Sequence, residues 1–469
     1  MFKKVLMTAA FASMAFGQSL EERVEALEYA GYENWFKFSG NLEYRFDNVT
    51  RKSNIGYTSI GFDGSSVTRS AGDEETTAHH RLFSELDIEA KPSEKLTFYA
   101  RLAMTKYFNT LNKGGGDYAD EGAFNELSEG AQAGSSRLFM ERAFVNYNFS
   151  KTLTLSVGRL PTIDGAPKHM AQARTMMGNY PNLAFAGIFD GLAMTYSKNI
   201  GATNIKLRGI YTPFNQRNVG NVNDKLRDGS GGTSGNKVDE NTDVYSFMLE
   251  ADRENLSWVR RIHFIYQYLY FNGLYALSGG TTVGSNPPAD TTVDFVTSSS
   301  SATLGLERHV LNLEMYGLFN TGLNFGISYF TGNTKGEGVY NSSALGGNFG
   351  TWYGTSNVDR DGDAMIINLS YKFSEFANGA TFGAEYLDSD DDAFLYDSAS
   401  FNRVSFYTIR GGDGKHLYWV QPVDRNFNVR LGWQQANNKK RNQLGGYIGP
   451  EQNIDDETTA FYTSLQFFF

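Results

Sequence analysis

The amino-acid sequence predicts an all-β protein, a transmembrane antiparallel up-and-down β-barrel of about 16 strands. Three observations support this fold class. Apolar and polar residues alternate in many separate segments, as in strands with one face toward lipid and the other toward water. Aromatic residues reach 14% although only 41% of residues are hydrophobic. After the N-terminal region, charged or polar residues interrupt every apolar run well below the roughly 20 residues of a membrane-spanning helix.

The first residues have the pattern of an export signal. Lys3 and Lys4 precede an apolar run from Val5 to Phe16, and small residues stand near its end. The run is shorter than a membrane-spanning helix requires, so we expect residues 1–17 to be a signal peptide and the mature chain to begin at Gln18.

A short amphipathic periplasmic helix is expected over residues 18–34, because Leu20, Val24 and Leu27 stand at helical spacing among charged residues. It is too short to be stable alone. It either packs against other copies as the start of a coiled coil or only separates the first strand from the signal peptide, and both alternatives stay open. The barrel itself is expected over residues 35–469.

Each strand of the barrel is predicted from a run of alternating residues. From Phe36 to Phe46, for example, Phe, Gly, Leu and Tyr alternate with Lys, Ser, Asn, Glu and Arg. The predicted strands are 36–48, 80–91, 96–108, 138–149, 152–160, 190–198, 204–212, 243–252, 258–271, 304–318, 322–331, 364–373, 380–387, 415–423, 425–436 and 457–469. The segment Val404 to Ile409 is assigned to a connector, because one more strand would break the even number that bacterial barrels have.

Connector lengths alternate between short and long, as they do between periplasmic turns and extracellular loops. All nine prolines fall in connectors or at strand ends, Pro213 among those in connectors, as expected for a closed barrel that offers no free edge strand. With an even strand count, both termini are then expected in the periplasm.

Composition and motifs argue against several functions. The net charge is −10, and −12 once two lysines leave with the signal peptide (−10 − 2), which argues against nucleic-acid binding. The chain has no Cys, so an exported protein of this length needs a large core or a closed sheet for its stability. The six histidines lack metal-ligand spacing, and no nucleophile elbow, zinc-protease motif or P-loop is present. We therefore expect no enzyme.

The last strand carries Phe461, Thr463, Leu465, Phe467 and Phe469 on one face. Apart from Thr463, this resembles the assembly signal of Gram-negative outer-membrane proteins, in which a terminal aromatic residue engages the barrel-assembly machinery. The resemblance implies an outer-membrane location, with lipid and lipopolysaccharide around the barrel.

A second resemblance lies in the segment RAFVNYNFSKTLTLSVGRLPT (Arg142–Thr162) and in the Asp190-Gly191 step. Both look like local patterns of the sixteen-stranded porins. The resemblance implies a homotrimer through which ions and small polar solutes diffuse passively. It also implies that the loop 161–188 folds into the lumen as a constriction, with Asp164, Lys168 and Arg174 at its surface; the alternative is an ordinary surface loop.

Strand parity directs Arg45, Arg101 and Arg142 into the lumen, where they could form a basic wall opposite the loop. The alternative is that these charges are simply solvated in a wide lumen. No cofactor is expected, except that Asp359, Asp361 and Asp363 make an oxygen-rich turn that resembles a calcium loop. A plain solvated acidic loop is the alternative there.

The sequence thus favours a water-filled porin for small polar solutes. The alternative from another class is a structural or conduit barrel, which anchors the envelope through the N-terminal helix or sheathes a partner protein.

Overall fold

A computed structural model describes the barrel strands and several segments between them. The described residues are 35–60, 66–107, 139–160, 180–184, 189–215, 242–275, 303–337, 360–393, 395, 406–442 and 451–469. The expected signal peptide and N-terminal helix lie outside them. No helix among the described residues is long and apolar enough to cross a membrane.

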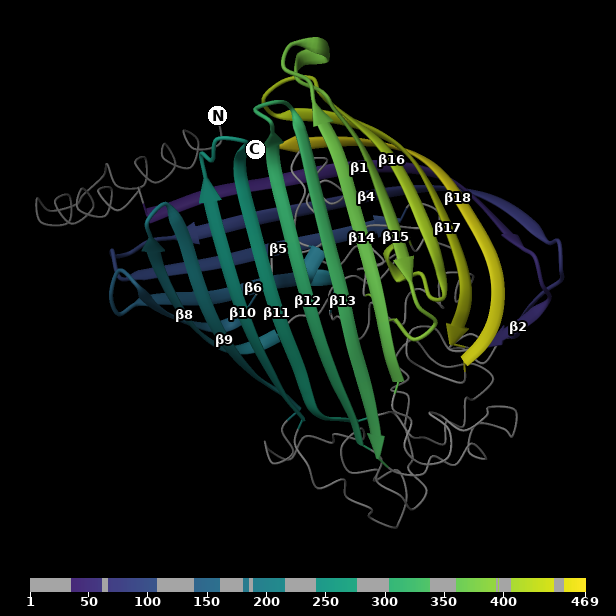
Figure 1. Ribbon diagram of the computed structural model, residues 1–469, viewed down its shortest axis with the longest axis horizontal. Helices are drawn as coiled ribbons and strands as arrows, with labels where there is room; N and C mark the ends of the chain where they lie inside the picture. The colour runs from purple at the N-terminus through teal and green to yellow at the C-terminus, as the bar shows by residue number, and fades with distance from the viewer. Residues whose placement is uncertain are drawn as a thin grey trace, which may run out of the picture.

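Sixteen antiparallel strands close into one barrel (Figure 1), which confirms the predicted fold class and strand number. The strands are β1 (Phe36–Ser53), β4 (Glu74–Ala90), β5 (Leu96–Tyr107), β6 (Phe139–Asn148), β7 (Leu153–Leu160), β8 (Phe189–Ile200), β9 (Thr203–Asn215), β10 (Thr242–Glu254), β11 (Val259–Tyr275), β12 (Thr303–Leu318), β13 (Leu323–Glu337), β14 (Arg360–Lys372), β15 (Thr381–Ser389), β16 (Gly412–Pro422), β17 (Phe427–Asn442) and β18 (Glu451–Phe468). Each predicted strand corresponds to one of them.

The first and last strands close the barrel against each other. β1 pairs with β18 from Asn41↔Phe468 to Ser53↔Asp456, and with β4 on its other side. The chain end belongs to the same ladder, because the Phe469 N–H donates to the Gly40 carbonyl at 3.1 Å. The Phe468 N–H donates to Asn426 in a short connector, so the C-terminus lies at the end of the barrel that carries the short connectors.

Several strands continue beyond their predicted ends toward the long connectors. β1 extends to Ser53 rather than to residue 48, and β18 begins at Glu451 rather than at 457. In these extensions the outward residues are polar, for example Thr50 and Lys52. The apolar alternation therefore marks only the part of a strand that faces lipid, and the ladder goes on without it.

Two differences concern smaller elements. A hairpin of β2 (Tyr57–Ile60) and β3 (Ser66–Arg69) forms a separate two-stranded sheet in the connector between β1 and β4, which the sequence did not predict. Pro213 lies inside β9 rather than in a connector. It stands at the register shift between β9 and β10, where a missing N–H donor is tolerated.

The outer surface carries an apolar band near the short connectors. On β13 the outward residues Leu323, Phe325, Ile327 and Tyr329 give way to Thr331 and Asn333 toward the long connectors. Exposed aromatic residues flank the band on both sides, with Phe319, Phe376 and Trp258 at the short connectors and Tyr245, Tyr386 and Phe461 toward the other end. This surface is the one that a bilayer requires of a barrel.

Candidate functional site

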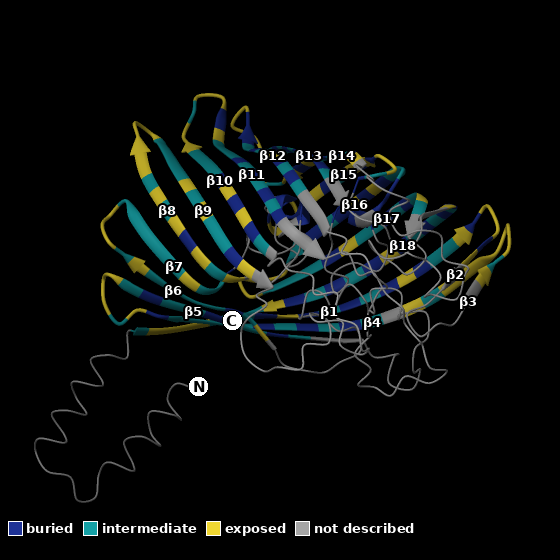
Figure 2. Ribbon diagram, turned by 90° about the horizontal axis from the view of Figure 1, so that it is seen from below, coloured by how far each residue is buried: buried dark blue, intermediate teal, exposed yellow. Residues whose placement is uncertain are grey.

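The candidate site is the lumen, because every second residue of each strand points into it. On β1, Asn41, Glu43, Arg45 and Asp47 are buried inside, while Leu42 faces outward. Figure 2 shows this alternation of buried and exposed residues along the strands. The lumen has two layers of different chemistry, one near the short connectors and one toward the long connectors.

The layer near the short connectors, here called the polar layer, is lined by charged side chains on β9 to β12. Lys206 on β9 lies 3.3 Å from Glu250 on β10, and Arg261 on β11 lies 2.7 Å from Asp252 on β10. The Lys206 side chain is 42% exposed, so this part of the wall is accessible to water. The polar layer carries both signs of charge on adjacent strands.

The three arginines predicted to line the pore lie on inward positions and are paired with carboxylates. Arg45 binds Asp47 at 2.6 Å, and Arg101 on β5 binds Asp87 at 2.6 Å. Arg142 on β6 lies 3.5 Å from Glu141. The arginines are therefore paired with carboxylates rather than forming the basic surface that the sequence suggested. Asp47 and Glu141 lie on the same strands as their arginines, and Asp87 lies on β4, the neighbour of β5.

Two tyrosines and two arginines form a stack along the inner wall of the four consecutive strands β16, β17, β18 and β1. The Arg430 guanidinium lies 5.0 Å from the Tyr418 ring and 5.4 Å from the Tyr462 ring, and Arg45 lies 4.1 Å from Tyr462. Such contacts stabilise buried cations. Two glycines make room for the rings on the inner wall.

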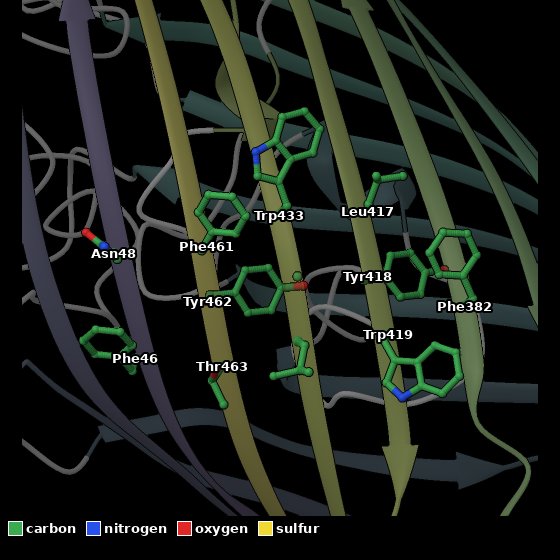
Figure 3. Close-up of a pocket in the computed structure, with 12 residues that line it drawn as sticks. Phe46, Asn48, Phe382, Leu417, Tyr418, Trp419, Trp433, Phe461, Tyr462 and Thr463 are labelled. Atoms are coloured by element: carbon green, nitrogen blue, oxygen red, sulfur yellow. The ribbon is translucent and has the colours of Figure 1, made fainter. Parts of the chain in front are cut away.

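Gly383 and Gly432 allow this close approach. A Cβ at Gly432 would lie 2.2 Å from Tyr462 Cζ, and one at Gly383 would lie 2.1 Å from Tyr418 Cζ. Figure 3 shows Tyr462 reaching across β17 and Tyr418 reaching toward β15. Only glycine fits beneath rings placed in this way.

Toward the long connectors the lumen is lined by buried apolar side chains from twelve of the sixteen strands, which we call the collar. Its members are Val49, Phe83, Ala103, Leu160, Val244, Met248, Ile265, Leu269, Phe271, Val310, Phe330, Ala364, Ile366, Leu387, Ala436 and Ala460. The sequence predicted strands with one face toward lipid and the other toward water, whereas at this level many inward residues are apolar and buried.

Two connector segments fill the collar beside β12 to β18. One is the 3-10 helix η3 (Tyr180–Ala184), and the other comprises Ala393, Leu395 and the region of η6 (Phe406–Thr408). Tyr180, Leu183, Phe406 and Ile409 form one apolar cluster with Val310, Ile366 and other collar residues. The connector assignment of Val404 to Ile409 is confirmed for its described part, which is no strand.

One carboxylate joins both inward segments to the barrel wall. Glu385 on β15 accepts hydrogen bonds from the Tyr180 hydroxyl and, at 3.1 Å, from the Tyr407 hydroxyl. His416 Nδ1 lies 2.6 Å from Glu385 Oε2, and its Nε2 lies 2.8 Å from the Tyr462 hydroxyl. Burial, followed by the Glu385 charge, raises the pKa of Tyr180 well above its ordinary value, so Tyr180 keeps its proton and donates.

The predicted constriction residues Asp164, Lys168 and Arg174 lie outside the described residues, as does most of the loop 161–188. Its described part, η3, lies inside the barrel against β12. The constriction by this loop stays a prediction.

The acidic residues proposed for calcium do not form the expected turn. Asp361 and Asp363 are in extended strand β14, and Asp363 accepts a hydrogen bond from Tyr329 at 2.7 Å; Asp359 lies outside the described residues. Asp361 borders an open acidic groove with Asp388, Asp390, Asp391, Asp392 and Asp413. Within the described ranges no three His, Asp or Glu side chains are arranged to hold a metal. The turn prediction is wrong because β14 begins four residues earlier than expected.

The residues of the expected assembly signal face outward on β18. Phe461 and Phe469 are each 63% exposed, and the Phe467 ring stacks on Phe427 with centroids 4.6 Å apart. Phe461 borders an open apolar groove of about 490 Å³ with Trp433, Leu417 and other outward residues, drawn in Figure 3. Their role in assembly stays a prediction.

Sequence reasoning missed Glu385, His416, Tyr180 and Tyr407. Glu385 and Tyr180 stand 205 positions apart, and no local pattern links them. One signal was available in the apolar stretch VSFYTI of a connector (404–409). Such a run outside a strand is expected to be buried elsewhere in the protein.

Solved structures of outer-membrane proteins resemble this fold. OprB of Pseudomonas putida has a TM-score of 0.46 at 14% identity, with 96% of each chain covered. OmpF of Salmonella typhi has a TM-score of 0.45 at 10% identity, with 92% of this chain and 97% of OmpF covered. OmpT, an outer membrane protein of Vibrio cholerae in its trimer form, has a TM-score of 0.43 at 11% identity, with 92% and 99% covered. At these TM-scores the likeness says nothing of function.

No curated protein matches this sequence. The family described as "Protein of unknown function (DUF3373)" matches residues 73–460, which include fifteen of the sixteen barrel strands in whole or in part. The protein therefore belongs to the DUF3373 family.

Proposed function

We propose that the protein is a porin-type channel of the outer membrane, through which ions and small polar solutes diffuse passively. Support comes from the closed barrel with its outward apolar band and from the water-accessible polar layer inside it. A membrane protein whose outer face meets lipid and whose inner face carries solvated charge is suited to solute passage.

The exposed ion pairs of the polar layer carry this proposal. Lys206, Glu250, Asp252 and Arg261 line the inner wall between 16% and 42% exposed. Charges that served only to hold the wall together would be expected to lie buried. Because cations and carboxylates alternate on neighbouring strands, the layer favours hydrophilic solutes without a strong preference for one sign of charge.

Orientation and partners follow from the same proposal. The short connectors and the C-terminus would face the periplasm, and the long connectors the outside, among lipopolysaccharide. Assembly would require the barrel-assembly machinery, and the functional unit would be a homotrimer. Light scattering of the purified protein, corrected for detergent, measures the number of subunits directly.

Conductance across a planar lipid bilayer tests the channel. We expect stepwise currents after the purified, folded protein is added, with similar permeabilities for potassium and chloride. A complete lack of channels at every voltage, from protein that is folded and inserted, would contradict the proposal.

The filled collar favours a second candidate, a structural barrel that anchors the envelope. A barrel whose lumen is partly occupied by packed connector segments can serve as an anchor, and the occupied part leaves no room to sheathe a partner. Deletion of residues 18–31 distinguishes the structural anchor from the channel. If envelope attachment or a bound partner is lost while the barrel stays folded and conducts nothing, the anchor is favoured.

A further inference from the structure

The collar lies inside the lumen, on the route of any solute that passes through the barrel. Its apolar side chains come from twelve of the sixteen strands, and η3 and the η6 region pack against those of β1, β12 to β15, β17 and β18. A hydrated ion that passes close to this apolar surface loses water without gaining a polar partner from it, which is unfavourable. In channels, apolar constrictions therefore restrict the flow of ions.

The filling segments come from connectors, so the barrel ladder does not depend on them. Tyr180 and Leu183 belong to η3, and Tyr407 belongs to the η6 region. The hydroxyls of Tyr180 and Tyr407 both donate to Glu385, which is 3% exposed, and the η6 region is also held where the Ser389 hydroxyl donates to the Ile409 carbonyl. Because Glu385 also lies against His416, which reaches Tyr462 on β18, one carboxylate links both segments to the wall.

We infer that the collar and its two filling segments decide what crosses the barrel, and that Glu385 is the positioning residue that keeps them in the closed arrangement. This inference rests on the proposed channel function. An apolar layer, completed by two different connectors, thus selects the solutes that pass. A residue of the barrel wall holds these connectors in place.

Cysteine labelling tests the inference, since the chain contains no native Cys. Ala460→Cys places a thiol in the collar, where the native residue is fully buried, and Ser197→Cys places one on the inner wall of β8, where it is half-buried. The rate of reaction with a small charged thiosulfonate is followed by mass spectrometry. We expect Ala460→Cys to react at least tenfold more slowly than Ser197→Cys.

Glu385→Gln is then introduced into both cysteine variants. A glutamine side chain keeps the shape but replaces one carboxylate oxygen by an amide NH2 group that only donates, so it cannot bind Tyr180, Tyr407 and His416 as the two carboxylate oxygens do. We expect the rate at Ala460→Cys to rise at least tenfold, the rate at Ser197→Cys to stay unchanged, and single-channel conductance to increase. Equal reaction rates at both cysteines before this change would overturn the filled collar.

A second pair of variants separates the holding contact from a general loss of structure. Tyr180→Phe with Tyr407→Phe removes only the two hydroxyls that reach Glu385, whereas Tyr211→Phe removes a hydroxyl bound to Asp243 away from the collar. The double variant should reproduce the effect of Glu385→Gln, and Tyr211→Phe should not. Heat-modifiable migration on gels verifies that each barrel is folded.

The outcomes distinguish this inference from the channel proposal. If Glu385→Gln speeds labelling at Ala460→Cys but no variant carries a current, passive diffusion is refuted and the role of Glu385 is supported. Currents with unchanged labelling and unchanged conductance in Glu385→Gln refute the role of Glu385 but support the channel.

Discussion

The close approach of Tyr462 to Gly432 makes a small substitution informative. Gly432→Ala adds one methyl group on the inner wall of β17, at a point 2.2 Å from Tyr462 Cζ and 2.4 Å from its hydroxyl oxygen. The ring must move away. When it moves, it loses its contact with His416 and its place between Arg45 and Arg430.

The expected loss of stability is the sum of three contributions. Overpacking of a buried position costs about 1–3 kcal/mol. The hydrogen bond between His416 and Tyr462 is worth about 1 kcal/mol, and a desolvated cation–π contact contributes roughly 1–2 kcal/mol. Since relaxation recovers part of each, we expect Gly432→Ala to lower the free energy of unfolding by about 3–4 kcal/mol.

Equilibrium unfolding in guanidinium chloride, followed by tryptophan fluorescence in detergent micelles, measures this difference. The matched control is Gly209→Ala on the outer face of β9, where an added Cβ meets no atom within 4 Å. The control should change stability by less than about 1 kcal/mol, because alanine suits a strand better than glycine. If both variants unfold at the same denaturant concentration, the reasoning about the ring and the glycine is refuted.

Three further predictions concern other parts of the barrel. Arg208 lies on the inner wall of β9 with its guanidinium 3.6 Å from Glu250. Reversing the charge of Lys206 and Arg208 to Glu should shift the reversal potential in a salt gradient toward cation preference; an unchanged potential would mean that ions do not pass the polar layer. Asp456→Ala removes the hydrogen bonds that Asp456 on β18 accepts from Ser53 at the end of β1 and from Tyr57 on β2, worth about 2–4 kcal/mol together, and should speed proteolysis within the β2–β3 hairpin. Asp455→Ala is the control. If proteases cleave both variants at the same rate, the hydrogen bonds to Asp456 do not hold the hairpin. Phe469→Ala should lower the yield of folded barrel from cells while leaving unfolding of the purified protein nearly unchanged; a normal yield would argue against an assembly signal.

The barrel could be predicted from the sequence because the pattern that marks each strand lies within that strand. Each strand that faces lipid must alternate, so Phe36 to Phe46 and Phe427 to Trp433 reveal both their strand character and their outward face. In a closed barrel with an even number of strands, the first and last strands must pair antiparallel, as β1 and β18 do. Strand ends were less certain, since beyond the lipid band the alternation fades although the ladder continues.

The lumen could be predicted only in part. Inward direction of Arg45 and Arg142 followed from parity, but their neutralisation by Asp47 and Glu141 depends on neighbouring side-chain conformations. The joining of Tyr180 to Glu385 depends on how two connectors fold inside, and no periodic pattern encodes that. Contacts inside the barrel between segments far apart in the chain therefore cannot be predicted from the sequence alone.

The seam between β1 and β18 has a consequence for biogenesis. Ser53 binds Asp456 across 403 positions, so the final ladder forms only after nearly all of the chain has been synthesised. Until then two strand edges with unpaired N–H and C=O groups would be open, a state that lipid does not tolerate and that invites aggregation. Such long-range pairing also slows folding. Cells that make this protein must therefore protect an incomplete chain until its two ends meet.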